Sequence, residues 1–204
     1  AGTTIEYNLS NYLGPNDIIT PSAQADYRAQ NFNFESKISL FLKKLGLSKL
    51  SKFFRGEYTD HMHAIQIKKK INSKLYKDYF KFCVEREPVD KTISYFFMRK
   101  NSINSSYKRK NISWDDFVKK KRFPVDTNFY SDGKKLLVDK IIKNENLKTD
   151  LPFLLKNLGI NNFIIKKSVN NKFRGKNPSV SNLQKKIIYD KFKSTLKFVD
   201  YKLN

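Results

Sequence analysis

The sequence predicts an α/β protein in which a parallel sheet is flanked by helices. Two observations support this fold class. Short runs in which apolar and polar residues alternate, as in strands, are interspersed with stretches in which apolar residues recur every three or four positions, as in helices. The hydrophobic fraction of 39% and the aromatic fraction of 14% are sufficient for a packed core. A chain of 204 residues fits one domain, so residues 1–204 are expected to form a single unit.

The first third of the chain predicts a helix, a strand and a second helix. Residues 5–13 carry apolar side chains at helical spacing and are followed by a Gly-Pro pair, which ends a helix. Residues 17–20 form a short strand-like run closed by a proline. The apolar positions of residues 38–45 again repeat at helical spacing, up to a glycine.

The middle of the chain predicts a strand between two helices. Residues 61–71 combine an inward apolar face with solvated lysines, as in a surface helix. Residues 79–84 alternate, which predicts a buried strand that ends at residues 85–87. Pro88 stands where the first residue of the next helix belongs. The basic residues 99–111 are expected to form a loop after that helix.

Four further elements are expected after residue 112. Ser113 and Asp116 form a capping-box-like pattern for a short helix. A leucine-rich stretch ends at Gly159, as helices often do, and is followed by a mostly basic loop over residues 161–178. In chain order the elements are a short helix from Ser113, a strand over residues 136–142, a helix over residues 151–158 and a final helix over residues 181–192.

Three polar motifs fall at the expected carboxyl ends of strands, where parallel sheets bind ligands. They are Gly2-Thr3-Thr4, Arg86-Glu87-Pro88 and Glu145-Asn146. Small residues and hydroxyls that open a helix can hold an anion on unpaired backbone N–H groups, although Gly-Thr-Thr is also an ordinary helix start.

Arg86 and Ser94 could converge on one phosphate, because Ser94 lies about two turns into the helix that follows Arg86. The alternative is a surface pair of Arg86 with Glu85 or Glu87, with Ser94 turned to solvent. The residues alone leave both interpretations open.

The net charge of +22 indicates an affinity for polyanions or, equally, the lysine-rich composition that an AT-rich genome produces. Cys83 is the single cysteine, so the chain forms no internal disulfide. No stretch approaches the roughly 20 apolar residues of a membrane span, and no signal peptide is visible. We therefore expect a cytoplasmic protein of bacterial or viral origin. Because the chain starts at Ala1 without a methionine, a Golgi-lumenal protein with an upstream anchor stays an alternative.

The segment around Arg86 resembles a known family. Its Arg-x-Pro-x-x-(Arg/Lys)-x-x-Ser pattern, which follows an aromatic-rich strand and ends at Ser94, is similar to the 3′-phosphate-binding segment of PAPS-dependent carbohydrate sulfotransferases of Golgi membranes and bacteria. Residues 1–4, Ala-Gly-Thr-Thr, resemble the end of that family's 5′-phosphosulfate loop. The resemblance covers nearly the whole chain. It implies a P-loop-like parallel sheet flanked by helices, with the first strand missing from this chain.

The resemblance also implies a cofactor, 3′-phosphoadenosine 5′-phosphosulfate (PAPS), with the desulfated nucleotide PAP as product. A late basic loop in the family, similar to residues 173–178 here, closes over the adenosine end. The implied cofactor-binding residues are Gly2, Thr3 and Thr4 for the 5′-phosphate, Arg86 and Ser94 for the 3′-phosphate, and Arg174 and Lys176 in the late loop.

This sequence departs from the family pattern at three points. The loop lysine that acts on the leaving group would lie two residues before Ala1. Lys91 stands where the family usually has arginine, and lysine lacks the bidentate fork of arginine. Glu87 stands where aspartate or asparagine is usual.

His61 and His63 are the candidate catalytic bases. Imidazole titrates near neutrality, and the family places a histidine or glutamate in this region. His61 fits the family's His-x-x-Ala pattern best, with His63 or Glu57 as substitutes. No metal is expected, because no cysteine or further histidine completes a site.

The function predicted in this way is transfer of a sulfuryl group to a hydroxyl, most simply that of a carbohydrate acceptor bound near residues 21–34. A binding protein that keeps the cofactor fold without catalysis is one alternative. A basic nucleic-acid-binding module is the other. The aromatic residues argue against the latter, because most lie at helix or strand spacing on apolar faces, so no nucleic acid partner is expected.

Overall fold

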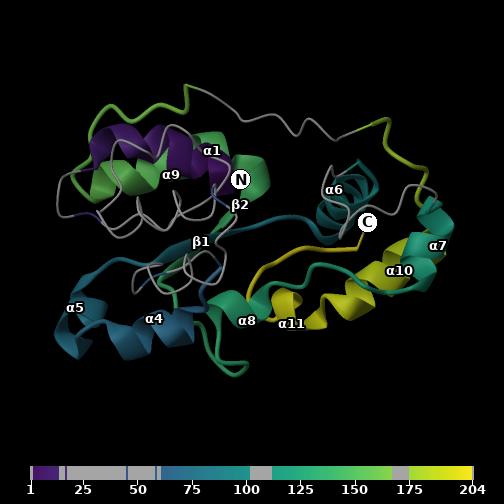
Figure 1. Cartoon of the computed structure of the whole chain (residues 1–204), viewed down its shortest axis with the longest axis horizontal. Coiled ribbons are helices and arrows are strands. Elements are labelled where there is room, and N and C mark those ends of the chain that lie inside the picture. The colour runs from purple at the N-terminus through teal and green to yellow at the C-terminus, as the bar shows by residue number, and fades with distance from the viewer. Residues whose placement is uncertain are drawn as a thin grey trace.

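The computed structural model describes residues 2–13, 17, 45, 58, 61–101, 112–166 and 175–203 (Figure 1). Within these ranges helices and strands alternate along the chain. The elements are α1 (Gly2–Leu9), η1 (Ser10–Tyr12), α4 (Ala64–Lys70), α5 (Ser73–Asp78), β1 (Phe82–Glu85), α6 (Pro88–Asn101), α7 (Trp114–Lys119), α8 (Thr127–Tyr130), β2 (Lys140–Lys143), η3 (Asn144–Asn146), α9 (Leu147–Asn157), α10 (Asn182–Lys191) and α11 (Lys193–Leu196).

Strands β1 and β2 form a parallel sheet, so the predicted α/β class with parallel strands is confirmed. Phe82 lies opposite Lys140, and Glu85 lies opposite Lys143. The two strands therefore end at the same level, and the segments that follow them start side by side. Each strand leads into a helix, β1 into α6 and β2 through η3 into α9.

One face of the sheet packs against α1 and α9, which lie side by side in Figure 1. Side chains of alternate strand residues, Phe82 and Val84 on β1 and Ile142 on β2, point into this core. The helices contribute Ile5 from α1 and the fully buried Leu151 from α9. This arrangement explains why the first eight described residues are helical, since the apolar side of α1 completes a core built by distant segments.

A second core lies among α6, α7 and α10. The aromatic rings of Phe96 and Phe117 meet edge to face, with their centroids 5.3 Å apart. Phe192, at the end of α10, is completely buried in the same core. The predicted assignment of most aromatic residues to apolar faces agrees with this core.

Local signals for helix ends are confirmed. Helix α6 begins at Pro88, and Ser113 and Ser181 cap α7 and α10. The Ser113 hydroxyl accepts a hydrogen bond from Asp116 N at 3.1 Å, as a capping residue does. Helix α9 is followed by Gly159, whose φ of 86° suits glycine.

The expected strand over residues 79–84 is wrong at its amino end. Tyr79 ends α5, and its N–H donates to Leu75 O, so it is not available to a strand. Tyr79 and Phe80 are exposed, and pairing with β2 begins at Phe82. The predicted strand thus began three residues too early.

The expected strand over residues 136–142 is also wrong at its amino end. Asp132 Oδ1 accepts hydrogen bonds from the N–H groups of Lys134 and Lys135 and builds a tight turn. Leu136 then forms an antiparallel bridge back to Ser131. Strand β2 begins only at Lys140, after this turn has closed.

Other expectations need smaller corrections. The helix predicted over residues 61–71 spans Ala64–Lys70. Residues 99–101 of the predicted loop over residues 99–111 belong to α6, and residues 102–111 lie outside the described residues. The short elements α5, α8 and α11 were not predicted. The strand expected at residues 17–20 and the helix at residues 38–45 lie, apart from residues 17 and 45, outside the described residues.

Candidate functional site

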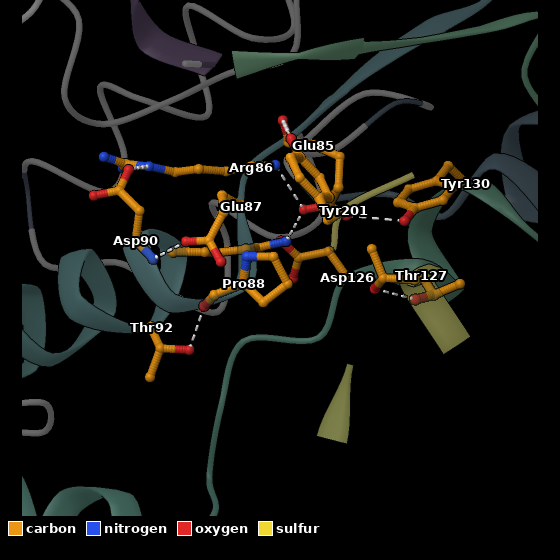
Figure 2. A network of polar contacts seen from close by, with 12 residues as sticks. Glu85, Arg86, Glu87, Pro88, Asp90, Thr92, Asp126, Thr127, Tyr130 and Tyr201 are labelled. Atoms are coloured by element: carbon orange, nitrogen blue, oxygen red, sulfur yellow. Dashed lines mark hydrogen bonds and ion pairs between the residues drawn. The ribbon is translucent and has the colours of Figure 1, made fainter. Parts of the chain in front are cut away.

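The turn after β1 is built around a buried carboxylate, Glu85, which is only 1% exposed (Figure 2). Glu85 Oε1 accepts hydrogen bonds from Lys91 Nζ at 2.5 Å and from Arg86 N at 3.0 Å. Glu85 Oε2 accepts from the hydroxyl of Tyr130 at 2.8 Å. A buried charge is tolerated only when it is paired and hydrogen-bonded, and both oxygens of Glu85 meet this condition.

Lys91 joins this carboxylate to a second acid. Its Nζ lies 2.8 Å from Asp126 Oδ2, just before α8, and 5.7 Å from the centre of the Phe192 ring. The Lys91 side chain is mostly buried. The ammonium group of Lys91 is therefore engaged within the protein. Lys91 stands where the sulfotransferase pattern described above usually has arginine.

Glu87 and Glu145 bring the ends of the two strands together. Glu145 follows β2, and its Oε1 accepts a hydrogen bond from Glu87 N at 3.0 Å. The Glu87 carboxylate in turn accepts from Asp90 N at 2.7 Å in the first turn of α6. The expectation that the motifs after the two strands meet at one edge of the sheet is confirmed for these two.

Two tyrosines from the end of the chain reach the same edge. The hydroxyl of Tyr201 lies 2.8 Å from Glu145 Oε2, and that of Tyr189 lies 3.0 Å from Glu87 Oε1. Burial, with the neighbouring carboxylates adding to it, raises the pKa of both phenols well above the ordinary value. The pKa of Tyr130 is raised in the same direction by burial and by Glu85. These hydroxyls therefore keep their protons and act as donors.

Arg86 points along the first turns of α6. Its Nε pairs with Asp90 Oδ2. The alternative in which the Arg86 guanidinium pairs with Glu85 or Glu87 is therefore wrong. In the described part of the chain, Asp90 is the acceptor that the guanidinium contacts, which leaves Nη1 and Nη2 for another oxyanion. Ser94 lies one turn beyond Asp90 and is half-buried. Residues four apart share a helix face, so Asp90 and Ser94 lie on one side of α6, and Arg86, two residues before the helix, reaches this side through Asp90.

The late basic loop packs against the same helix. A Cβ atom at Gly175 would lie 3.0 Å from Phe97 Cε1, and Phe97 is three residues after Ser94 on α6. Lys176 follows directly and is exposed. Arg174 lies outside the described residues. The part of the predicted loop that the structure describes thus lies at the helix that carries Ser94.

The Gly2-Thr3-Thr4 motif begins α1. Gly2 is exposed with open space where a Cβ would stand, and Thr4 is buried. The Thr4 carbonyl accepts a hydrogen bond from Asn8 Nδ2 at 2.7 Å, and Asn8 Oδ1 accepts from Lys166 N at 2.9 Å. The side chain of Thr3 lies outside the described residues. These contacts connect α1 to the segment that follows α9.

His61 and His63 come together over one aromatic ring. Their ring centroids lie 6.4 Å and 4.4 Å from that of Phe129 on α8. His61 has a φ of 57°, which is uncommon outside glycine, and its side chain is exposed. Phe129 precedes Tyr130, so α8 contacts the histidine pair through one residue and Glu85 through the next. Glu57, the third candidate base, lies outside the described residues.

Cys83, beside this network on β1, gives the first testable prediction. Burial raises the pKa of its thiol to about 12, with Glu85 adding to the shift and Lys91 opposing it. The thiolate is the reactive form, so Ellman's reagent is expected to label the folded protein about 1000-fold more slowly than the urea-unfolded protein at pH 8. Because the folded pKa is raised, the thiol's contribution to stability is complete below its ordinary pKa and declines as the pH rises toward 12. Equal labelling rates would contradict this environment.

The sequence interpretation missed most of this network. Glu85 was treated as the end of a strand, and Tyr130, Tyr189 and Tyr201 received no role. The available signal was the acidic residue Glu85 directly after the apolar strand predicted over residues 79–84. If the in-and-out alternation of the strand continues to this residue, its carboxylate is buried and needs a partner. Within the described residues no group of three or more histidine, cysteine, aspartate or glutamate side chains is placed to hold a metal ion. No described helix has the length and apolar character to cross a membrane.

Comparison with known proteins finds one informative relative. No protein-family model matches the chain, and no solved structure matches it. A protein of Archaeoglobus fulgidus, named only "Uncharacterized protein", is 33% identical over 105 residues, which span 48% of this chain and 83% of that protein. Identity at this level over most of the relative's length shows common descent. The chain therefore belongs to the same family as this Archaeoglobus fulgidus protein.

Proposed function

We propose that the protein is a PAPS-dependent sulfotransferase with a P-loop-like fold and that Arg86 and Ser94 bind the 3′-phosphate of the nucleotide. The observation that carries the proposal is the orientation of Arg86. Its Nε is held by Asp90, and the remaining guanidinium nitrogens are left for a phosphate near the side of α6 that carries Asp90 and Ser94. The position of Gly175 against Phe97 supports a late loop over the same nucleotide end.

The other end of the nucleotide belongs at the start of α1. Gly2, Thr3 and Thr4 form the first turn of α1, where the helix dipole suits the 5′-phosphate. The open space at Gly2 admits an oxyanion close to the backbone. Two phosphates of one nucleotide would then be held by two segments separated by more than 80 residues in sequence.

In the proposed reaction the acceptor hydroxyl oxygen attacks sulfur, and the bond between sulfur and the bridging phosphate oxygen breaks, which releases PAP. The proton of the hydroxyl goes to His61, with His63 as the alternative base. The left-handed backbone at His61 supports this role, because such conformations cluster at functional sites. The acceptor class we propose is a carbohydrate.

Nucleotide binding tests the proposal directly. Calorimetric titration is expected to give tighter binding of PAP than of adenosine 5′-phosphate, because only PAP carries the 3′-phosphate that Arg86 would contact. Single-stranded DNA should bind more weakly than PAP at 0.15 M salt, where exposed lysines are screened. Preferential binding of DNA would favour the nucleic-acid module instead.

Replacing Arg86 with alanine is expected to lower PAP affinity about 100-fold, since it removes a charge-assisted contact to phosphate. Arg122→Ala is the matched control, because Arg122 is an exposed arginine that lies in the segment after α7. Unchanged PAP affinity in the Arg86 variant would exclude the proposed site. Transfer of labelled sulfate from PAPS to a panel of glycans by the full-length protein separates a catalyst from a protein that only binds the nucleotide.

A further inference from the structure

We propose that the C-terminal segment, residues 199–203, is a positioning element that orients Arg86 toward the nucleotide. This inference rests on the proposed function of Arg86. It concerns residues that the nucleotide itself does not need to touch. The observation behind it is that Tyr201 contacts the peptide carbonyl before Arg86 directly and the peptide N–H after Arg86 through Glu145.

The first contact is to the peptide bond before Arg86. The Tyr201 hydroxyl lies 3.2 Å from Glu85 O and 2.8 Å from Glu145 Oε2. A hydroxyl carries one proton, so it is shared between these two acceptors and favours the nearer, charged one. When the proton points to Glu85 O the hydroxyl holds this carbonyl, and when it points to Glu145 Oε2 the hydroxyl holds the carboxylate.

The second contact is to the peptide bond after Arg86. Glu145 Oε1 accepts from Glu87 N at 3.0 Å, so the carboxylate held by Tyr201 also fixes this N–H. Glu87 is held from its side-chain end as well, because its Oε1 lies 3.0 Å from the Tyr189 hydroxyl. The same hydroxyl lies 2.8 Å from Lys202 O in the C-terminal segment, so its one proton is shared between this carbonyl and the Glu87 carboxylate.

The C-terminal segment is itself anchored to the sheet. Lys143, the last residue of β2, donates to Asp200 O at 2.5 Å, and its ammonium lies 4.8 Å from the centre of the Tyr201 ring. Val199 is buried. Strand β2 therefore holds the segment that holds the turn after β1, and Figure 2 shows Tyr201 beside Glu85 in this arrangement.

The carboxylates of this edge are fully engaged by the protein. Each oxygen of Glu87 and Glu145 has a hydrogen-bond donor at 2.7–3.0 Å. Acids held in this way are suited to fixing geometry. Among the described residues of this turn, Nη1 and Nη2 of Arg86 are the groups left for a phosphate, because Nε pairs with Asp90. Small displacements of a binding residue lower affinity strongly, so loss of the Tyr201 hydroxyl should be visible in ligand discrimination.

The test compares PAP with adenosine 5′-phosphate in Tyr201→Phe. We expect affinity for PAP to fall about tenfold, which is the effect usual for removing a hydrogen bond that orients a ligand-binding group. Affinity for adenosine 5′-phosphate should stay unchanged, because that ligand lacks the phosphate bound by Arg86. Tyr189→Phe, which removes a separate hydroxyl, should act in the same direction and serves if Tyr201→Phe does not fold.

Tyr79→Phe is the matched control, because Tyr79 is 56% exposed and lies before β1. A purely structural role of Tyr201 would lower the unfolding temperature but leave the ratio of the two affinities unchanged, and that result would overturn the inference. If the wild-type protein shows no preference for PAP over adenosine 5′-phosphate, the proposed function fails instead. The two failures are thus distinguishable.

Discussion

Replacing Glu85 with alanine is expected to lower the free energy of unfolding by about 3–5 kcal/mol. The change leaves the Tyr130 hydroxyl and Arg86 N without their acceptor and removes one of the two carboxylates paired with Lys91. All of these groups are held at the carboxyl end of β1, where water cannot easily replace Glu85. Urea denaturation followed by far-UV circular dichroism measures the effect.

Two further variants make this result interpretable. Glu85→Gln keeps one carbonyl acceptor and should cost less than Glu85→Ala. Asp190→Ala breaks an ion pair with Lys193, in which both side chains are more than half exposed, and should change stability by less than about 1 kcal/mol. A loss in Glu85→Ala no greater than that in Asp190→Ala would show that the Glu85 network contributes little to stability.

Replacing Phe192 with alanine is expected to cost about 3–5 kcal/mol, because the ring is completely buried among α6, α7 and α10. The cavity would open next to Lys91, whose ammonium lies 5.7 Å from the ring centre. The same urea denaturation applies. Phe192→Ala and Glu85→Ala therefore act on neighbouring parts of the protein. Their effects on the free energy of unfolding should be non-additive in the double variant.

Phe153→Ala is the control for the loss of an aromatic ring. Phe153 lies on α9 and is 69% exposed, so its removal should change stability by less than about 0.5 kcal/mol. Phe192→Leu, which fills most of the volume, should fall between wild type and alanine. Similar costs for Phe192→Ala and Phe153→Ala would contradict the packing of this core.

The parts of the fold that could be predicted from sequence depend on local chemistry. Pro88 has the backbone angle of a first helical residue, and the hydroxyl of Ser113 or Ser181 satisfies an N–H group only a few residues away. Such signals need no knowledge of the rest of the chain. The parallel pairing of β1 with β2 followed from the alternation of strands and helices.

The parts that could not be predicted depend on distant partners. The burial of Glu85 is decided by Lys91, Tyr130 and Tyr201, and a sequence pattern of charges does not specify such pairs. Helix α8 is a single turn, too short to show a helical period. For the candidate site, Arg86 and Ser94 could be chosen because Ser94 lies about two turns into the helix that follows Arg86. Asp90 as the partner of Arg86 required the structure.

The sequence separation of the Glu85 contacts has a consequence for how the protein folds. Tyr130 is 45 residues and Tyr201 is 116 residues away, so both contacts require closure of long loops. Long-range contacts of this kind make folding slow relative to helix formation. If they form after the rate-limiting step, Glu85 gains these two hydroxyl donors late, and the network governs how long the native state survives more than how quickly it is reached.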